Sequence, residues 1–221
     1  MIYKTSGVVF RFTRYGETSI IVTIFTALFG LQSYIVNGAR SKSSKGKMAL
    51  FQPLTLLDLV VYHRANASIM RIKELKCLYP YQQVTSNVRK SSIALFLNEV
   101  LNKSVKEESH AEELCNFLIE SLITLDQLPE PIENFHLTFL VQLSRYLGFS
   151  PQSIEEVARG RWMSDEEEKA LRHLVTMQAS PLHISYVTRK ILLDVLTRFY
   201  ATHVENFGEL RSTQVLHEIL T

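Results

Sequence analysis

The stretch RYGETSIIVTIFTALFGLQSYIVNG, residues 14–38, decides the fold of the first part of the chain. It contains two runs rich in β-branched and aromatic residues, at 20–25 and 31–36. Glycine-containing turns bound both runs, at Gly16, Gly30 and Gly38. Short apolar runs between such turns are typical of strands joined in hairpins.

Three further runs of the same kind lie outside this stretch, at residues 8–10, 54–62 and 69–78. Five short strands within the first 80 residues favour a compact closed or half-closed β-barrel. Closure also removes the exposed edges that so many strands would otherwise leave.

After Pro80 the apolar residues repeat with a helical period. Ser109 with Glu112, and Ser164 with Glu167, have the spacing of capping boxes. Ser150-Pro151 and Ser180-Pro181 place a cap residue before a first-turn proline. We therefore predict an α+β protein, with a barrel domain at 1–80 and an all-α helical domain at 81–221. Its helices are expected near 87–102, 110–126, 131–147, 151–159, 165–178, 183–206 and 212–220.

Charge divides the chain at the same place. Residues 1–80 hold 11 basic and 3 acidic residues, a net charge of +8, whereas residues 81–221 hold 13 and 19, a net charge of −6. A half-chain this basic attracts polyanions, and nucleic acid is the first of these.

A basic segment at residues 37–47 contains four cations among small residues: Arg40, Lys42, Lys45 and Lys47. Each side chain could meet a phosphate, although a solvated turn would have the same composition. The glycines in this segment are too far apart for a phosphate-binding loop, and Met48 stands where such a loop has Ser or Thr.

Further candidates for nucleic-acid contact lie outside that segment: Arg14, Arg64, Lys73 and the aromatic residue Tyr15. Single-strand binding needs rings for the bases and cations for the phosphates. Most aromatic residues of the strands should be core, but Tyr15 lies at a polar turn and is expected to be exposed.

Catalytic and metal-binding patterns are absent from the sequence. It has no GxSxG, HExxH or CxxC motif, and its seven histidines are scattered. The acidic run 165–168 is better explained as a first helical turn, where the helix dipole favours carboxylates. Cys77 and Cys115 indicate free thiols in a reducing cytoplasm. We therefore expect no enzyme activity, cofactor, metal, signal peptide or membrane span.

Four stretches, in order along nearly the whole chain, resemble the RecO family of bacterial recombination mediators. They are RYGETSIIVTIFTALFG (14–30), VNGARSKSSKGKMALFQP (36–53), LSRYLGFSP (143–151) and HVENFGELRSTQVLHEI (203–219). The resemblance implies an oligonucleotide-binding (OB) fold barrel followed by a helical domain, in a cytoplasmic protein associated with the bacterial nucleoid.

The resemblance also implies an activity. Family members bind single- and double-stranded DNA, anneal complementary strands, and work with RecR to load RecA onto DNA coated by single-strand-binding protein. They contact that protein through its acidic, aromatic-ended C-terminal tail. Many members carry a four-cysteine zinc motif that this sequence lacks, since residues 152–162 contain no cysteine. Packing around Val157 and Trp162 is expected to replace it.

We therefore predict a DNA-binding recombination mediator. Its protein partners are expected on the helical half, where an apolar pocket with basic residues at its rim would suit an acidic tail. Candidate rim residues are Arg145, Arg189 and Lys190. Two alternatives remain: an RNA-binding or RNA-annealing barrel protein, and a scaffold whose basic face meets an acidic protein.

Overall fold

A computed structural model describes residues 1–41, 46–64, 67–106, 111–178 and 182–220. By their contacts, these residues form two compact units. The first is Met1–Gln82 with Val105–Gln127, and the second is Gln83–Ser104 with Leu128–Thr221. The predicted division at residue 80 stays a prediction, because a helical segment from beyond it belongs by its contacts to the first unit.

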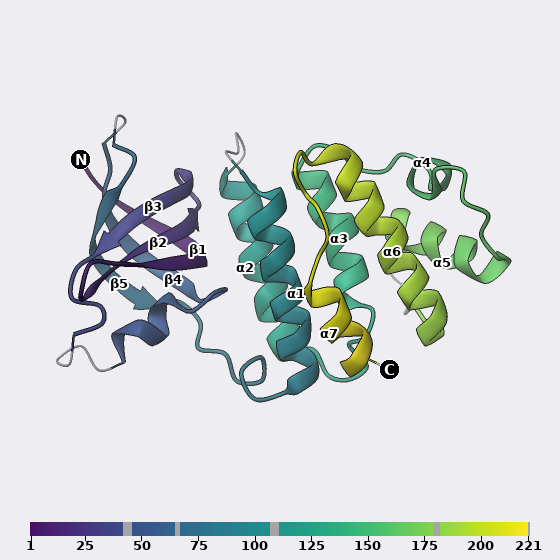
Figure 1. Cartoon of the computed structure of the whole chain (residues 1–221), viewed down its shortest axis with the longest axis horizontal. Helices are drawn as coiled ribbons and strands as arrows, with labels where there is room; N and C mark the ends of the chain where they lie inside the picture. The colour runs from purple at the N-terminus through teal and green to yellow at the C-terminus, as the bar shows by residue number, and fades with distance from the viewer. Residues whose placement is uncertain (42–45, 65–66, 107–110, 179–181, 221) are drawn as a thin grey trace. The chain divides into compact units, whose positions relative to one another are not determined.

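Five strands close into a barrel in the first unit, in the order β1-β2-β3-β5-β4 (Figure 1). This confirms the predicted OB-like architecture. The strands are β1 (Ile2–Tyr15), β2 (Ser19–Thr26), β3 (Gly30–Val36), β4 (Leu56–Tyr62) and β5 (Met70–Cys77). β1 is longer than its apolar run because it serves two neighbours: residues 2–8 pair with β4 and residues 7–15 pair with β2.

The barrel core consists of inward-facing apolar side chains from all five strands, and the 3-10 helix η1 (Lys47–Phe51) adds Phe51, which is fully buried. Gly7 lies where β1 is paired on both sides, with Thr26 and with Leu57. A Cβ atom on Gly7 would lie 2.8 Å from Cγ2 of Ile24 and 3.0 Å from the carbonyl oxygen of Phe25. Only glycine fits this position without displacing a neighbour.

The helix α2 (Ala111–Gln127) packs against β1, β2 and β3. Its buried Asp126 accepts hydrogen bonds from the hydroxyl of Tyr79 at 3.0 Å and from the backbone N–H of Gln82 at 2.9 Å. The Cys115 thiol lies 3.8 Å from the carbonyl oxygen of Phe25, to which it donates. Burial raises the pKa of this thiol to about 12, so it stays protonated. These contacts fix α2 and the segment after β5 to the barrel.

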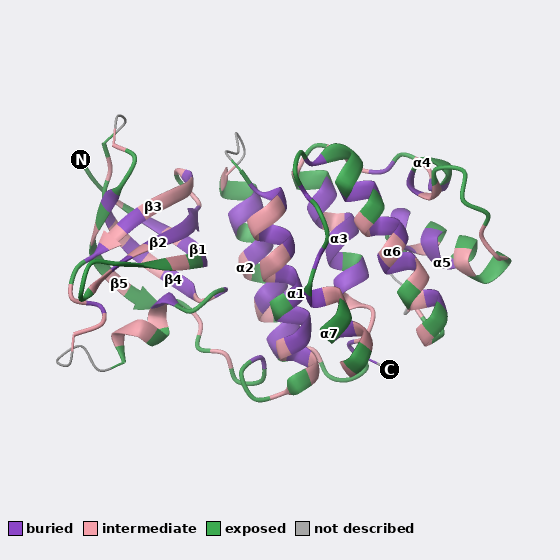
Figure 2. Ribbon diagram, viewed as in Figure 1, coloured by how far each residue is buried: buried purple, intermediate pink, exposed green. Residues whose placement is uncertain are grey.

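The second unit contains the remaining helices, whose apolar sides are buried (Figure 2). They are α1 (Val88–Ser104), α3 (Phe135–Tyr146), α4 (Ile154–Ala158), α5 (Asp165–Val175), α6 (Tyr186–His203) and α7 (Ser212–Ile219). The capping box of Ser164 and Glu167 is confirmed. The cap predicted at Ser150 is wrong, because Ser153 caps α4 by accepting from the N–H of Glu156. Ser109 and Ser180 lie outside the described residues.

Glu99 of α1 holds the start of α7. Its carboxylate accepts hydrogen bonds from the backbone N–H groups of Arg211 and Ser212, at 3.0 and 2.8 Å, and from the Ser212 hydroxyl at 2.6 Å. Burial alone would raise the pKa of Glu99, but the bonds from Ser212 and Arg211, together with nearby Lys103, lower it. The ionised carboxylate thus serves as the N-terminal cap that α7 lacks on its own chain.

Trp162 does not pack as expected. Val157 is buried, with 2% of its surface exposed, but Trp162 is 84% exposed. The prediction that both residues replace the missing zinc motif is therefore wrong for Trp162. The segment is held instead by backbone bonds at the end of α4 and by the capping box of α5.

The substitution Gly7→Ala should lower the free energy of unfolding by about 1–3 kcal/mol, because the added methyl group overpacks the barrel. Chemical denaturation would measure the loss. Lys4→Ala, an exposed change on the same strand, is the control and should stay within about 0.5 kcal/mol of the parent. Equal stability of Gly7→Ala and the parent would contradict the close packing.

The substitution Glu99→Gln should lower the free energy of unfolding by about 1–3 kcal/mol at neutral pH, since α7 loses its charged cap. Folding lowers the pKa of this carboxyl group below its ordinary value of 4.5. The group therefore stabilises the protein fully at pH values above 4.5, and this contribution is lost as the pH falls through the lowered pKa. The difference between variant and parent should therefore shrink as the pH drops below that value. A difference that does not change with pH would refute the ionic cap.

Candidate functional site

Most of the predicted nucleic-acid residues that the structure describes fall into two groups on the barrel. The first group, Arg14, Tyr15 and Arg40, lies around the turn between β1 and β2. Arg14 and Tyr15 end β1, and both are exposed, Tyr15 by 53% as predicted. Lys47 begins η1 and is half-buried. Lys42 and Lys45 lie outside the described residues.

Arg40 was predicted to contact a phosphate, and in the structure its guanidinium group bonds backbone carbonyl groups. Its Nη2 atom donates to the carbonyl oxygens of Gly16 and Glu17, both at 2.6 Å, and its Nε atom donates to that of Ser19 at 3.4 Å. These bonds tie Arg40 to the turn that follows Tyr15. The side chain therefore fixes the shape of the turn that presents Tyr15, which is a positioning role.

The second group lies where β4 leads into β5. Arg64 follows β4 and is exposed, and no ion pair to it is found among the described residues. Lys73 lies in β5 with its Nζ atom 3.5 Å from the Glu74 carboxylate. Exposed pairs of this kind are weak, so Lys73 can exchange its partner for a phosphate.

A row of cross-strand neighbours links the two groups. Tyr62 of β4 pairs with Arg71 of β5, Arg71 with Ile35 of β3, Ile35 with Ile21 of β2, and Ile21 with Thr13 of β1. We call these five residues the outer row. Adjacent partners lie about 5 Å apart, so the row spans about 20 Å and ends two residues before Tyr15.

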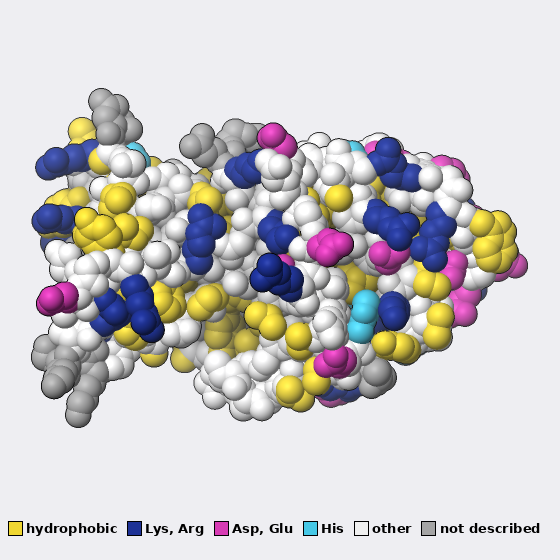
Figure 3. Space-filling view, in the orientation of Figure 1, with side chains coloured by type: hydrophobic (Ala, Val, Ile, Leu, Met, Phe, Trp, Pro, Cys, Tyr) yellow, Lys and Arg dark blue, Asp and Glu magenta, His cyan; other side chains and the backbone are white. Residues whose placement is uncertain are grey.

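The outer row combines an exposed ring and a cation with half-buried apolar side chains. Tyr62 is 43% exposed, Arg71 is exposed, and Ile21 and Ile35 are half-buried. Arg71 has no ion pair within the described part of the chain. In Figure 3 the barrel region carries a group of hydrophobic side chains with Lys and Arg side chains beside it. This surface can stack bases and neutralise phosphates along one path.

Sequence reasoning did not select Tyr62 or Arg71. Both residues were visible, as an aromatic residue and a cation at the edges of predicted strands. Their pairing depends on a register shift opposite Val60 and Val61, where Lys73 is an extra residue in β5. A one-residue shift reverses the face on which a side chain lies, and alternation within a single strand does not reveal it.

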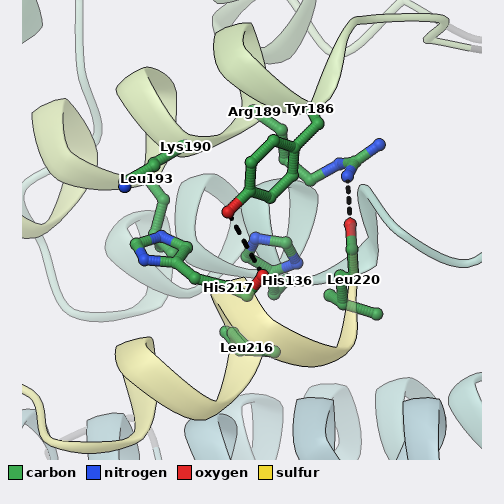
Figure 4. Close-up of a pocket in the computed structure, with 8 residues that line it drawn as sticks. All are labelled: His136, Tyr186, Arg189, Lys190, Leu193, Leu216, His217 and Leu220. Carbon is green, nitrogen blue, oxygen red and sulfur yellow. Dashed lines mark hydrogen bonds between the residues drawn. The ribbon is translucent and has the colours of Figure 1, made fainter.

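A separate pocket lies in the second unit and includes two of the three predicted partner residues, Arg189 and Lys190 (Figure 4). The other residues that line it are His136, Tyr186, Leu193, Leu216, His217 and Leu220. The third, Arg145, does not line the pocket, and its Nη2 atom donates to the carbonyl oxygen of Val175 at 3.1 Å. The sequence did not distinguish Arg145 from Arg189, because both lie on amphipathic helices.

Arg189 is held in a fixed orientation at this pocket. Its Nε atom donates to the side chain of Asn134 at 3.0 Å, and its Nη1 atom donates to the carbonyl oxygen of Leu220 at 2.7 Å. Tyr186 donates its hydroxyl to the carbonyl oxygen of His217 at 3.2 Å. One wall of the pocket is formed by α7 and the following Leu220. Two side chains of α6 therefore anchor this wall (Figure 4).

Two imidazole nitrogens are buried in this region without a hydrogen-bond partner among the described residues: Nδ1 of His136 and Nε2 of His217. Burial, with Arg189 and His217 nearby, lowers the pKa of His136 to about 3. Burial and the charge of Lys190 also lower the pKa of His217. Both rings are thus neutral near pH 7. Buried polar atoms without partners are uncommon in folded proteins and suit a site that takes up a polar group.

None of the helices in the described ranges is both long and apolar enough to cross a membrane.

Comparisons with known proteins agree with this architecture. The model of the family "Recombination protein O N terminal" matches residues 1–81, and that of "Recombination protein O C terminal" matches residues 85–161. The chain is 34% identical over 238 positions to the DNA repair protein RecO of Flavobacterium johnsoniae, with all of both chains covered. It is 32% identical over 240 positions to that of Bacteroides fragilis, with 99% of both covered. The chain therefore belongs to the RecO family of DNA repair proteins.

Proposed function

We propose that this chain is a recombination mediator of the bacterial nucleoid that binds single- and double-stranded DNA and anneals complementary strands. With RecR, it would help to load RecA onto DNA coated by single-strand-binding protein. The observation that carries the DNA-binding part is the outer row, which joins two cationic groups through an exposed ring. Family membership supports the rest.

The barrel would hold a strand by two kinds of contact. Bases would stack on Tyr15 and Tyr62, while Arg14, Arg64 and Arg71 meet phosphates. Neutralising the phosphates of two strands lowers their mutual repulsion, and base pairing then drives annealing. This mechanism needs neither a catalytic group nor nucleotide hydrolysis.

The pocket in the second unit would receive the acidic, aromatic-ended tail of single-strand-binding protein. Leu193, Leu216 and Leu220 offer an apolar wall, and Lys190 offers a cation at the rim. An apolar pocket with a few polar groups is the usual form of a site for a short ligand.

The affinity for single-stranded DNA should fall as salt rises, with a log–log slope of about −3.5 if about five phosphates are contacted. The substitution Arg71→Ala should reduce the steepness of that slope by about 0.7, because one contact is lost. Fluorescence anisotropy with an oligonucleotide at several salt concentrations measures both values. A salt-independent affinity rules out the proposal, and stronger binding of RNA than of DNA of equal length favours an RNA-binding protein instead.

The substitution Tyr62→Ala should weaken single-strand binding by about 1–3 kcal/mol and leave the salt slope unchanged, because the ring contributes stacking and no charge. Tyr62→Phe should keep most of the affinity. Tyr146→Ala is the matched control, since Tyr146 is 40% exposed but lies on α3 of the other unit. Equal losses in Tyr62→Ala and Tyr146→Ala would argue against stacking on the barrel.

The substitution Lys190→Glu should weaken binding of an acidic peptide with a free aromatic C-terminal residue, by on the order of tenfold. Lys169→Glu is the control with the same charge change, on an exposed position of α5. Isothermal titration with the full chain measures the difference. If both variants bind the peptide like the parent, the tail does not bind in this pocket.

A further inference from the structure

Trp162 is the one tryptophan of the chain and, at 84% exposure, one of its most exposed apolar side chains. It lies between α4 and α5, and the backbone around it is fixed. The N–H of Arg161 donates to the carbonyl oxygen of Ala158 at 3.0 Å, and the capping box of Ser164 begins α5 two residues later. The indole is thus presented to solvent by an ordered segment.

Three arginines are near this segment in the chain or linked to it by ion pairs. Arg159 and Arg161 precede Trp162, and both are exposed. Nη1 of Arg161 lies 3.5 Å from the Asp194 carboxylate, and Nη2 of Arg198 lies 2.9 Å from the same group. Two guanidinium groups share one carboxylate, so the cluster of Arg159, Arg161, Arg198 and Asp194 keeps a net positive charge.

Figure 3 shows several Lys and Arg side chains over α4 and α6, with hydrophobic side chains at the neighbouring edge of the second unit. We call Trp162 with Arg159, Arg161 and Arg198 the Trp–Arg edge. An exposed ring among cations is the combination that binds single-stranded nucleic acid, through base stacking and phosphate contact.

The carboxylates of the first turn of α5 limit what this edge can bind. Several of them already have partners: Glu166 accepts from the Thr188 hydroxyl at 2.8 Å, Glu167 from the N–H of Ser164 at 2.9 Å, and Glu168 pairs with Arg172 at 2.9 Å. Their charge still repels a long polyanion. The edge therefore suits a flexible strand that turns a base and one or two phosphates toward it, rather than a duplex.

We propose that the Trp–Arg edge is a second contact site for single-stranded DNA, outside the barrel. The proposal rests on the DNA binding proposed above and adds a site to it. A second contact on the same chain raises the affinity for a strand long enough to reach both sites.

The emission of Trp162 itself provides the test, because the full chain has no other indole. Oligothymidylate should quench this emission and protect the indole from acrylamide, at the concentrations at which anisotropy reports binding. Trp162→Ala should weaken binding of a long oligonucleotide roughly 5-fold or more, the loss expected for one stacked base. Trp162→Phe should restore most of the affinity.

The matched control moves the indole to another exposed position. In the double variant with Trp162→Phe and Tyr146→Trp, the emission should not respond to the oligonucleotide. Binding by anisotropy with unchanged Trp162 emission overturns the second site and leaves the barrel proposal intact. Absence of any binding overturns both. Quenching by the acidic peptide and not by DNA would assign the edge to a protein partner and overturn the proposal as well.

Discussion

The short parallel pairing of β3 with β5 is the constraint on which the candidate interface depends. Only Tyr34 with Met70 and Ile35 with Arg71 are paired there, yet this contact closes the barrel. Closure leaves the sheet without open edges. It also places the start of β5 beside the end of β3, so that Arg71 and Tyr62 join a row that ends near the turn after β1. Without this pairing, β3 and β5 would be the two edges of an open sheet in the order β3-β2-β1-β4-β5, and Ile35 and Arg71 would lie on opposite edges.

Much of this fold could be predicted from local signals in the sequence. Glycine turns and β-branched runs located the five strands, and the Ser164–Glu167 spacing located the start of α5, because turn chemistry and capping depend on neighbours in the chain. The pairing of Tyr62 with Arg71 could not be predicted, because it depends on an irregular register. The backbone bonds of Arg40 were hidden for a similar reason: a guanidinium reaches three carbonyl groups only when the turn has folded around it.

For Trp162, the sequence predicted a packing role that the structure does not show. Its size made a packing role the natural expectation, since large apolar side chains are usually buried to a high degree. The segment that carries it is instead stabilised by capping and backbone hydrogen bonds, and these do not require the indole to be buried. Where backbone bonds fix a segment, composition gives little information about the exposure of its side chains.

Charge is unevenly distributed within the first unit, as well as between the two halves of the sequence. The helix α2 belongs to the first unit and brings four acidic and no basic residues to it, and one of these, Asp126, is buried and hydrogen-bonded. The positive charge of that unit is therefore concentrated on the strands and their turns. A polyanion drawn to this unit meets the least repulsion on the barrel surface away from α2. Because the outer row lies on the strands, the electrostatic attraction and the stacking surface coincide, and a single binding path can use both.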